Sequence, residues 1–378
     1  MKTLTIISHT EHYKTLEGQV VGFGSTVAEI NHLLDIFDHI YHVAMLHDQN
    51  PPENTMPYSS DKVTFVPLPA LGGSRLIDKL NIVLKIPKVI NIVRKTVAKS
   101  EYFQFRAPTG IGVFVIPYLI LFSSKKGWFK YAGNWKQENP PLAYKFQRWL
   151  LKSQSRHVTI NGQWKDQPSH CLSFENPCLT DSELESGNQL IKDKALPDGQ
   201  FDLCFVGRLE EAKGIGRFIK AVTALGELNQ NKINVIRIIG DGPSTGQYYE
   251  MTKKSNINFQ FLGLVSRTKV HDIFKKSHAI ILPSASEGFP KVIAEAMNYG
   301  CLPVVSNVSS IAEYIKDGFN GFLLQSLDEI TLEQTLMRLL DISNDAYIQM
   351  IEQGHHNSKK FTFSYYNQQI EGKILKEK

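Results

Sequence analysis

The sequence predicts an α/β protein of two domains, each built on a parallel sheet with helices on both faces. Its 378 residues are more than a domain with a single hydrophobic core usually contains, and they suit two domains of about 100 to 200 residues each. Short β-branched runs alternate with helix-like segments along the chain, which is the pattern of parallel α/β sheets. A polar stretch at residues 176–184 suits a linker, so we place the domains at residues 1–178 and 179–357.

The composition is that of a globular protein, and no membrane span is expected. Hydrophobic residues make up 42% of the chain and charged residues 21%. The longest apolar run, Gly110–Phe122, contains Pro117 and is shorter than the roughly 20 residues that a spanning helix needs. The N-terminus lacks the features of a signal peptide. The four cysteines have no CxxC spacing, so we expect them to be reduced in a cytoplasmic protein.

Basic residues are concentrated in the first domain. Residues 1–178 contain 20 Lys and Arg against 13 Asp and Glu, a net charge of +7, whereas the whole chain carries +5. The segment Arg75–Lys99 has seven bases and one acid, alternating with aliphatic residues. Such a helix can lie on an anionic membrane surface, or it can cover a sheet with its lysines in water; Pro87 should break it. No nucleic-acid-binding motif accompanies these bases, so no nucleic-acid partner is expected.

The first domain should contain several strands and a glycine loop. We expect strands at residues 4–7, 40–46, 63–67, 102–105, 128–131 and 157–160. Gly22-Phe-Gly24 leads into a helix at residues 27–34, and its backbone can approach a phosphate or simply form a turn. Arg106 follows the strand at 102–105, where ligand sites collect in α/β sheets. It is either a charge contact to a ligand or one half of a surface salt bridge.

The second domain places two cations in a glycine-bearing loop. Arg208 and Lys213 follow the strand at 201–206, where an Arg fork and a mobile Lys charge would suit a diphosphate, although Lys-Gly loops are common without a ligand. The loops at Gly207, Gly263 and Pro283 should meet at one edge of one sheet. We expect an irregular, exposed segment at residues 184–199, further strands at 235–239 and 259–262, and helices at 217–228 and 267–276.

The most informative stretch is residues 280–305, which should form strand, loop, helix and strand. Glu287 lies on the loop, and Glu295 lies inside a helix that Pro290 begins and Gly300 ends. The helix N-terminus offers backbone amides to an anion, and the two carboxylates can accept hydrogen bonds from hydroxyls. These amides belong to Gly288, Phe289, Lys291 and Val292.

The motifs of the second half follow the order of a known family. They are Val206-Gly-Arg-Leu209 with Lys213-Gly214, Ile239-Gly-Asp-Gly-Pro243, Phe261-Leu-Gly263, the stretch from Glu287 to Glu295, and residues 311–322. Together, over residues 200–325, they resemble the retaining GT-B glycosyltransferases of family four, also called group 1. The resemblance implies two Rossmann-like domains facing across a cleft, the first binding the acceptor and the second the nucleotide sugar. It also implies that a C-terminal helix in residues 358–378 returns to the first domain.

The resemblance assigns catalytic roles to three residues. Arg208 and Lys213 would bind the donor diphosphate and stabilise it as it leaves, and Glu287 would hold hydroxyls of the donor sugar. No Asp-x-Asp triplet occurs in the chain, so no metal is indicated. No cofactor is implied beyond the co-substrate, a UDP-sugar or a GDP-sugar. Retention would follow from a same-face displacement in which the leaving phosphate helps to deprotonate the acceptor.

Further residues would bind the donor. Glu295 would bind the ribose, the backbone around Leu264 would meet the base, and Gly24 would approach the phosphates from the first domain. The sequence departs from the family at one place, because Gln104-Phe-Arg106 stands where the family often has a pair of histidines that contact the donor sugar. Arg106 is therefore only a candidate contact from the first domain.

The predicted function is that of a metal-independent, retaining hexosyltransferase acting on a glycan or lipid-linked acceptor. We expect it to serve cell-surface polysaccharide or glycolipid synthesis, as a cytoplasmic protein that is peripheral on the inner face of the membrane. The basic first domain, with the aromatic residues of Lys125–Lys130, suits an anionic or lipid-linked acceptor. Two other classes remain open: a nucleotide-sugar 2-epimerase, and a non-catalytic subunit that binds nucleotide sugars.

Overall fold

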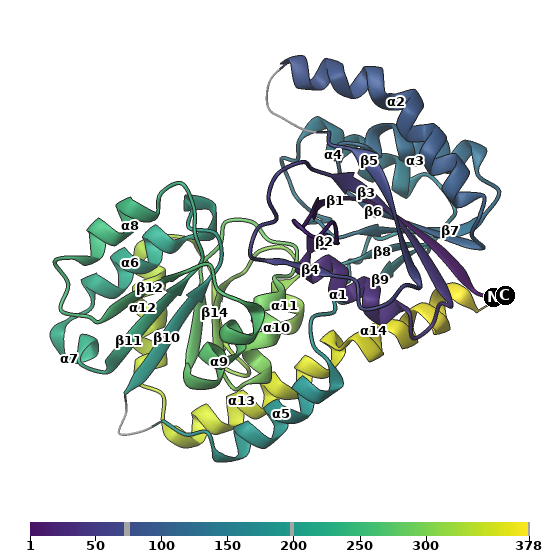
Figure 1. Cartoon of the computed structure of the whole chain (residues 1–378). Helices are drawn as coiled ribbons and strands as arrows, with labels where there is room; N and C mark the ends of the chain where they lie inside the picture. The colour runs from purple at the N-terminus through teal and green to yellow at the C-terminus, as the bar shows by residue number, and fades with distance from the viewer. Residues whose placement is uncertain (72–75, 197–199, 377–378) are drawn as a thin grey trace. The chain divides into compact units, whose positions relative to one another are not determined.

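The chain consists of two compact units. The computed structural model describes residues 1–71, 76–196 and 200–376 (Figure 1). The first unit comprises residues 1–175 and 366–378, and the second comprises residues 176–365. The division after residue 175 lies beside the polar stretch at 176–184, and the segment that returns to the first unit starts at Tyr366 rather than at residue 358.

A mixed sheet of nine strands forms the centre of the first unit. Its strands are β1 (Thr3–Lys14), β2 (Val20–Phe23), β3 (His39–Leu46), β4 (Thr55–Pro57), β5 (Val63–Pro69), β6 (Tyr102–Ala107), β7 (Lys126–Tyr131), β8 (Val158–Ile160) and β9 (Cys171–Ser173). The order β5–β3–β1–β6–β7–β8–β9 is parallel throughout. β2 and β4 extend the sheet in antiparallel fashion from the end of β1. The parallel sheet predicted for this half is confirmed.

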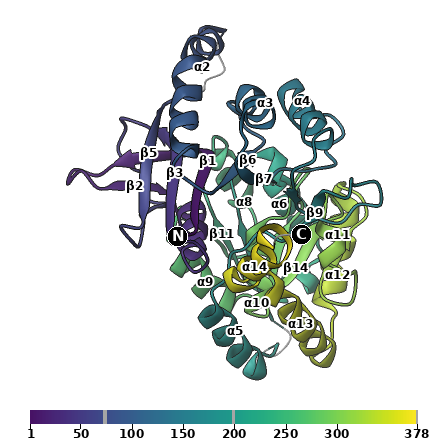
Figure 2. The same ribbon diagram turned by 90° about the vertical axis from the view of Figure 1, so that its right-hand side faces the viewer.

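Helices cover both faces of this sheet. They are α1 (Gly24–Leu33), α2 (Leu76–Val97), α3 (Gly112–Phe122), α4 (Leu142–Lys152) and the end of α14 (Phe363–Ile370), which a π-helical turn (Glu371–Leu375) follows. Successive side chains of β1 point to opposite faces of the sheet, and each face has its own hydrophobic core. Ile7 belongs to the core formed with α2, α3 and α4, whereas Leu4 belongs to the core formed with α1 and α14. Figure 2 shows α2, α3 and α4 next to one another on one face.

The basic helix of the first unit differs from the prediction. α2 continues from Leu76 to Val97 with Pro87 inside it, so the expected break at Pro87 is wrong. Proline has no N–H to donate to the backbone carbonyl one turn earlier. Because Pro87 is exposed, water can donate a hydrogen bond to that carbonyl instead. Arg75, the first base of the predicted segment, lies outside the described residues.

The second unit is built on a six-stranded parallel sheet. Its order is β12 (Phe259–Gly263), β11 (Ile233–Ile239), β10 (Phe201–Val206), β13 (Ala279–Leu282), β14 (Leu302–Ser306) and β15 (Phe322–Leu324). All neighbouring strands are parallel, so their carboxyl ends share one edge. The strands predicted at 201–206, 235–239 and 259–262 are therefore confirmed, each to within two residues.

Nine helices of the second unit lie within the described residues. They are α5 (Asp181–Asp193), α6 (Ile215–Ala224), α7 (Glu227–Gln230), α8 (Thr245–Thr252), α9 (Arg267–Lys276), α10 (Lys291–Asn298), α11 (Ile311–Tyr314), α12 (Glu329–Leu340) and α13 (Asn344–Ser358), with short 3₁₀ turns at Glu211–Lys213 and Lys359–Phe361. The prediction that residues 184–199 are irregular is wrong for residues 184–193, which belong to α5. In the described part of the chain, no helix combines the length and apolarity that crossing a bilayer requires.

Candidate functional site

The loops that follow β10 and β13 are packed against each other at the carboxyl edge of the second sheet. Gly214 has a φ of 77°, and a Cβ at this position would lie 2.2 Å from the carbonyl oxygen of Pro283. The amide of Ala285 donates a hydrogen bond to the carbonyl of Ala212 (2.8 Å). Only glycine tolerates both this φ and this approach, so Gly214 holds the two loops together.

The loops after β11 and β12 join the same edge. The amide of Gly207 donates to the carbonyl of Ile239 (3.0 Å), and the amide of Gly240 donates to the carbonyl of Gly263 (2.9 Å). A Cβ on Gly240, where φ is 131°, would lie 1.9 Å from the carbonyl oxygen of Gly207. The prediction that the loops at Gly207, Gly263 and Pro283 meet at one edge is thereby confirmed.

Lys213 and Glu287 form an ion pair across these loops. Lys213 Nζ lies 2.6 Å from Glu287 Oε1. Lys213 ends the 3₁₀ turn Glu211–Lys213, and Glu287 lies on the loop between β13 and α10. Both side chains are largely shielded from solvent, Glu287 more than Lys213. Two of the three residues that the resemblance makes catalytic are therefore in contact.

Arg208, the third of these residues, is not part of this ion pair and lies near Glu210. Its side chain is 71% exposed, and its Nε lies 3.6 Å from Glu210 Oε2. An exposed pair at this distance contributes little stability, so the guanidinium is free to change partners. Its contact with a diphosphate remains a prediction.

The N-terminus of α10 lies directly after Glu287. Pro290 is its N-cap residue, and no side chain caps it. The amides at the start of a helix have no acceptor within the helix, so those of Lys291 and Val292 are available to an anion. Phe289 anchors the loop, because its buried ring packs against Phe361 with ring centroids 4.7 Å apart.

One further contact fixes the loop after β13, and this loop also contains a buried serine hydroxyl for which no role was predicted. Ser310 Oγ donates to the carbonyl of Gly288 (3.1 Å). Ser284 Oγ is buried and has no hydrogen-bond partner among the described residues. Serine is common in loops, so nothing in the sequence marked Ser284. The described residues include no group of three His, Cys, Asp or Glu side chains that could hold a metal ion.

Glu295 lies in a separate polar network. Its Oε1 is 3.2 Å from Arg267 Nε and 3.5 Å from His271 Nε2. Arg267 also binds Glu183, and His271 Nδ1 lies 3.0 Å from the hydroxyl of Tyr299. Burial alone would raise the pKa of the Glu295 carboxyl, but the neighbouring imidazole and guanidinium outweigh it and lower the pKa. Glu295 is thus held as a carboxylate. Its ribose contact, like the base contact of the exposed Leu264, remains a prediction.

Arg106 forms a buried ion pair in the first unit. Its Nη2 donates to Glu29 Oε1 (2.9 Å), and its Nε donates to Gln104 Oε1 (3.0 Å). Lys130 Nζ donates to the same Glu29 oxygen (2.7 Å). Of the two alternatives for Arg106, the structure supports a salt bridge, although a buried one rather than one on the surface. The contact of Arg106 with a ligand remains a prediction.

Gly24 begins α1, and its amide already has a partner. It donates to the carbonyl of Asn54 (2.9 Å), and a Cβ on Gly24 would lie 3.0 Å from the same oxygen. A phosphate near this loop would therefore meet the neighbouring amides rather than that of Gly24. The predicted approach of Gly24 to the phosphates remains untested.

A buried chain of hydrogen bonds in the first unit was not anticipated. Ser8 Oγ lies 2.8 Å from His42 Nε2, His42 Nδ1 lies 2.6 Å from the Tyr58 hydroxyl, and that hydroxyl lies 2.9 Å from His12 Nε2. His12 Nδ1 donates to the carbonyl of Thr10 (3.0 Å). Burial lowers the pKa of His12 to about 4 and that of His42 well below its ordinary value. Both rings are therefore neutral near pH 7, and the chain runs from Ser8 as donor to Thr10 as acceptor. Its members are scattered in the sequence, so no spacing pattern marks it.

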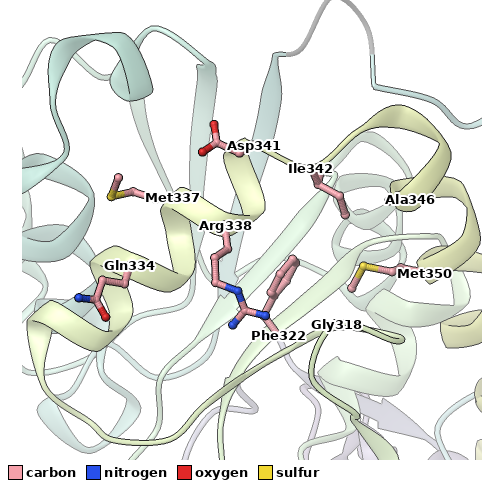
Figure 3. Close-up of a pocket in the computed structure, with 9 residues that line it drawn as sticks. All are labelled: Gly318, Phe322, Gln334, Met337, Arg338, Asp341, Ile342, Ala346 and Met350. Carbon is pink, nitrogen blue, oxygen red and sulfur yellow. The ribbon is translucent and has the colours of Figure 1, made fainter.

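A cavity of about 630 Å³ lies between β15, α12 and α13 (Figure 3). It is lined by Gly318, Phe322, Gln334, Met337, Arg338, Asp341, Ile342, Ala346 and Met350. None of these residues was predicted to belong to the site, and the cavity is separate from the Lys213–Glu287 pair.

The second half of the chain is similar to known proteins. Residues 188–356 match the family model "Glycosyl transferases group 1". Over 159 residues the chain is 30% identical to the Escherichia coli UDP-Gal:alpha-D-GlcNAc-diphosphoundecaprenol alpha-1,3-galactosyltransferase, and over 197 residues it is 27% identical to the glycogen synthase of Mycobacterium tuberculosis. The alignments cover 42% and 51% of this chain but only 41% and 47% of those proteins, less than half of each.

Solved structures resemble the chain along its whole length. Anabaena HepE, crystallised with UDP and glucose, has a TM-score of 0.69 at 14% identity and covers 99% of this chain and 100% of its own. Sucrose-phosphate synthase from Thermosynechococcus elongatus has a TM-score of 0.72 at 15% identity and covers 98% of both chains. Residues 188–356, slightly less than half of the chain, thus match the glycosyl transferases group 1 family, and the chain as a whole has the GT-B fold of two Rossmann-like domains.

Proposed function

We propose that this chain is a glycosyltransferase that moves a sugar from a UDP-sugar or GDP-sugar to a glycan or lipid-linked acceptor. The observation that carries the proposal is the Lys213–Glu287 ion pair beside the uncapped N-terminus of α10. A diphosphate is bound by cations and amide donors, and a sugar is bound by acceptors for its hydroxyls. One cluster of loops offers both, and the family match of residues 188–356 supports the same activity.

Donor binding would exchange the partners of the ion pair. The phosphates of the donor would take the Lys213 ammonium from Glu287, and the freed carboxylate would accept hydrogen bonds from the sugar hydroxyls. Neither partly buried charge is then left unpaired, which matters because an unpaired buried charge is costly. The pair therefore prepares both groups for the ligand without exposing either one.

The same groups would stabilise the transition state. Cleavage of the anomeric bond places positive charge on the sugar ring and negative charge on the departing phosphate. Lys213, Arg208 and the amides of Lys291 and Val292 would meet that negative charge, and preorganised donors favour the transition state over the ground state. We propose that these groups serve in place of a metal ion, and that the product retains the anomeric configuration through same-face displacement.

Glu295 would bind the ribose hydroxyls. Arg267 and His271 hold its carboxylate ionised and in place, so it enters the complex as an oriented acceptor. The backbone around Leu264, in the loop after β12, would meet the base. In the first unit, the backbone beside Gly24 and the Arg106 guanidinium are the candidate donor contacts.

We propose that the acceptor belongs to cell-surface polysaccharide or glycolipid synthesis. The name of the Escherichia coli relative describes transfer to a diphosphoundecaprenol-linked sugar, and the other relative is a glycogen synthase. The net charge of +7 on residues 1–178 suits an anionic or lipid-linked acceptor and an anionic membrane surface. The protein would then act as a hexosyltransferase at the cytoplasmic face of the membrane.

A nucleotide-sugar panel tests the proposal. Thermal shifts with UDP-sugars and GDP-sugars should identify the donor, because a ligand that binds only the folded state raises the melting temperature. The selected donor is then incubated with and without glycan or lipid-linked acceptors. Transfer that requires the acceptor supports the proposal. An epimerised donor formed without acceptor would instead indicate a 2-epimerase, and binding with neither reaction would indicate a non-catalytic subunit.

A further inference from the structure

The outward face of α3 is apolar although it faces solvent. The helix, with the sequence GVFVIPYLILF, contains no charged residue. Val115, Ile116 and Leu119 face the core, whereas Leu121 and Phe122 are 72% and 75% exposed. A helix that is apolar all round is normally buried. The exposed face of α3 therefore lacks a partner in this chain.

The neighbouring helix α4 also exposes apolar side chains. Leu142, Phe146 and Trp149 follow one another at helical spacing of four and three residues, so they share one face. Leu142 is 84% and Trp149 59% exposed, and the rings of Phe146 and Trp149 are stacked with centroids 6.0 Å apart. Lys145 and Lys152 are exposed on the same helix. An amphipathic helix whose apolar stripe faces solvent offers that stripe to a partner outside the chain.

The two helices lie next to each other in a basic part of the first unit. α3 packs against both α4 and α2 (Figure 2). We call the exposed residues Leu121, Phe122, Leu142, Phe146 and Trp149 the apolar patch. The segments 84–99, 112–126 and 142–152, which carry this patch and its neighbours, contain ten Lys and Arg and no Asp or Glu.

We propose that the apolar patch inserts into the headgroup region of an anionic lipid bilayer. Tryptophan, phenylalanine and leucine enter the boundary between headgroups and acyl chains, while lysine and arginine bind the anionic headgroups beside them. The charge of these segments selects the membrane as the partner, because ten bases without an acid match anionic headgroups, and the acyl boundary beside those headgroups accepts the exposed aromatic and aliphatic side chains. The occupant that satisfies both features is a membrane.

This inference deepens the proposed function and revises which helix makes the contact. It rests on the proposed function in one respect, since a lipid-linked acceptor gives the enzyme a reason to dock. Val89, Val93 and Val97 of α2 are buried in the core of the first unit, so α2 covers the sheet and supplies charge to the surface. α3 and α4 provide the residues that insert.

Vesicle flotation with the full chain tests the proposal. The protein should float with vesicles of phosphatidylcholine and phosphatidylglycerol, and much less with phosphatidylcholine alone. The variant Leu142→Ser/Trp149→Ser should bind at least about tenfold more weakly, because each large side chain withdrawn from the bilayer is worth about that factor. Leu228 of α7 is also 84% exposed, so Leu228→Ser is a matched control that should float like the wild type.

Tryptophan fluorescence locates the contact. Of the four tryptophans, Trp128 and Trp135 are buried, Trp164 is partly buried and Trp149 is exposed. Anionic vesicles with bromine on the acyl chains should quench the wild type, and Trp149→Phe should still float but lose the quenching. Equal flotation of wild type and Leu142→Ser/Trp149→Ser, flotation that ignores lipid charge, or quenching that survives Trp149→Phe would each overturn the proposal.

An activity readout separates this proposal from the proposed function. Transfer to a water-soluble acceptor analogue should be unchanged in Leu142→Ser/Trp149→Ser, whereas transfer to an acceptor embedded in anionic vesicles should fall with the loss of binding. Flotation without any transfer would reject the enzymatic function alone. Transfer without flotation would reject the membrane surface alone.

Discussion

Lys213 and Glu287 lie 74 residues apart in the chain, and their charged groups meet at 2.6 Å. The contact exists because Gly214 lets the loop after β10 approach the end of β13. One residue was predicted to bind phosphate and the other to bind sugar. Their pairing in the ligand-free chain means that the donor must compete with an internal salt bridge.

Glu287→Gln should abolish transfer while sparing nucleotide binding. The amide keeps the size of the side chain but loses the negative charge that accepts sugar hydroxyls, and we expect kcat to fall by about 10²-fold or more. Binding of the nucleoside diphosphate should be unchanged or tighter, because Lys213 no longer has an internal partner. Glu329→Gln, which removes the exposed partner of Lys220, is the control and should leave kcat unchanged. Normal turnover by Glu287→Gln would remove this residue from the mechanism.

Lys213→Met should weaken binding of the diphosphate specifically. Isothermal titration with the nucleoside diphosphate and with the nucleoside separates the two contributions. The affinity for the diphosphate should fall by about tenfold or more, the size of one charge-assisted hydrogen bond. The affinity for the nucleoside should not change. Equal losses for both ligands would indicate a general disturbance of the unit.

Gly214→Ala should destabilise the second unit and displace Lys213. A left-handed backbone costs a residue with a side chain about 1–3 kcal/mol, and the new Cβ would lie 2.2 Å from the carbonyl oxygen of Pro283. Chemical denaturation measures the loss. Gly246 lies within α8 with open space around it, so Gly246→Ala should be neutral or stabilising by about 0.5–1 kcal/mol. Equal effects at the two glycines would refute the close packing of the loops.

On acidification, the free energy of unfolding of Arg267→Met should begin to fall at a higher pH than that of the wild type. The folded pKa of Glu295 lies below its ordinary value of 4.5, so its ionisation stabilises the fold above that pH and the benefit is lost as pH falls through the folded pKa. Removing the guanidinium raises that folded pKa. Urea unfolding between neutral pH and about pH 3 should show stability declining earlier in the variant, with a loss of about 1–3 kcal/mol at neutral pH.

The matched control for this prediction lies on the same helix. Lys275→Met removes an exposed pair with Asp272 on α9, and exposed pairs contribute little. Its urea unfolding should follow the wild-type pH profile. An identical profile for Arg267→Met would show that Arg267 does not hold Glu295 ionised.

The buried side chain of Lys194 should make the free energy of unfolding rise at alkaline pH. Its buried ammonium donates to the carbonyls of Ser277 (2.7 Å) and Tyr299 (2.6 Å), and burial lowers its pKa from 10.5 to about 8. Between these two pH values the unfolded chain still binds the proton that the folded chain has lost, so the free energy of unfolding rises with pH. Relative to Lys194→Met, the wild type should gain roughly 2–3 kcal/mol across this range. A constant difference between the two would contradict the buried ammonium.

The strands of the second sheet were predicted well from the sequence, whereas the polar helix α5 was not predicted. The strand at 201–206 and the helix at 267–276 were predicted with the bounds that the structure gives, because both have clear apolar periods and flanking turn residues. α5 was missed although Thr180 and Glu183 form a capping box at its start. It has few apolar residues, since it packs through a narrow stripe that includes Ile191.

Candidate site residues could be predicted individually, but their partners could not. Spacing selected Glu287 and Glu295, yet the contacts of Lys213 with Glu287 and of Glu295 with Arg267 join distant segments. The same is true of Arg106, whose buried partner Glu29 lies on α1. Such pairings depend on how the sheet orders its strands, which local patterns do not encode.

The crystal structure of the protein with its nucleotide-sugar donor tests the central claim most directly. We predict that the diphosphate lies within hydrogen-bonding distance of Lys213 Nζ and of the amides of Lys291 and Val292, with Glu287 turned from Lys213 to the sugar hydroxyls. A diphosphate bound away from these groups, or a Lys213–Glu287 pair that persists beside a bound donor, would contradict it.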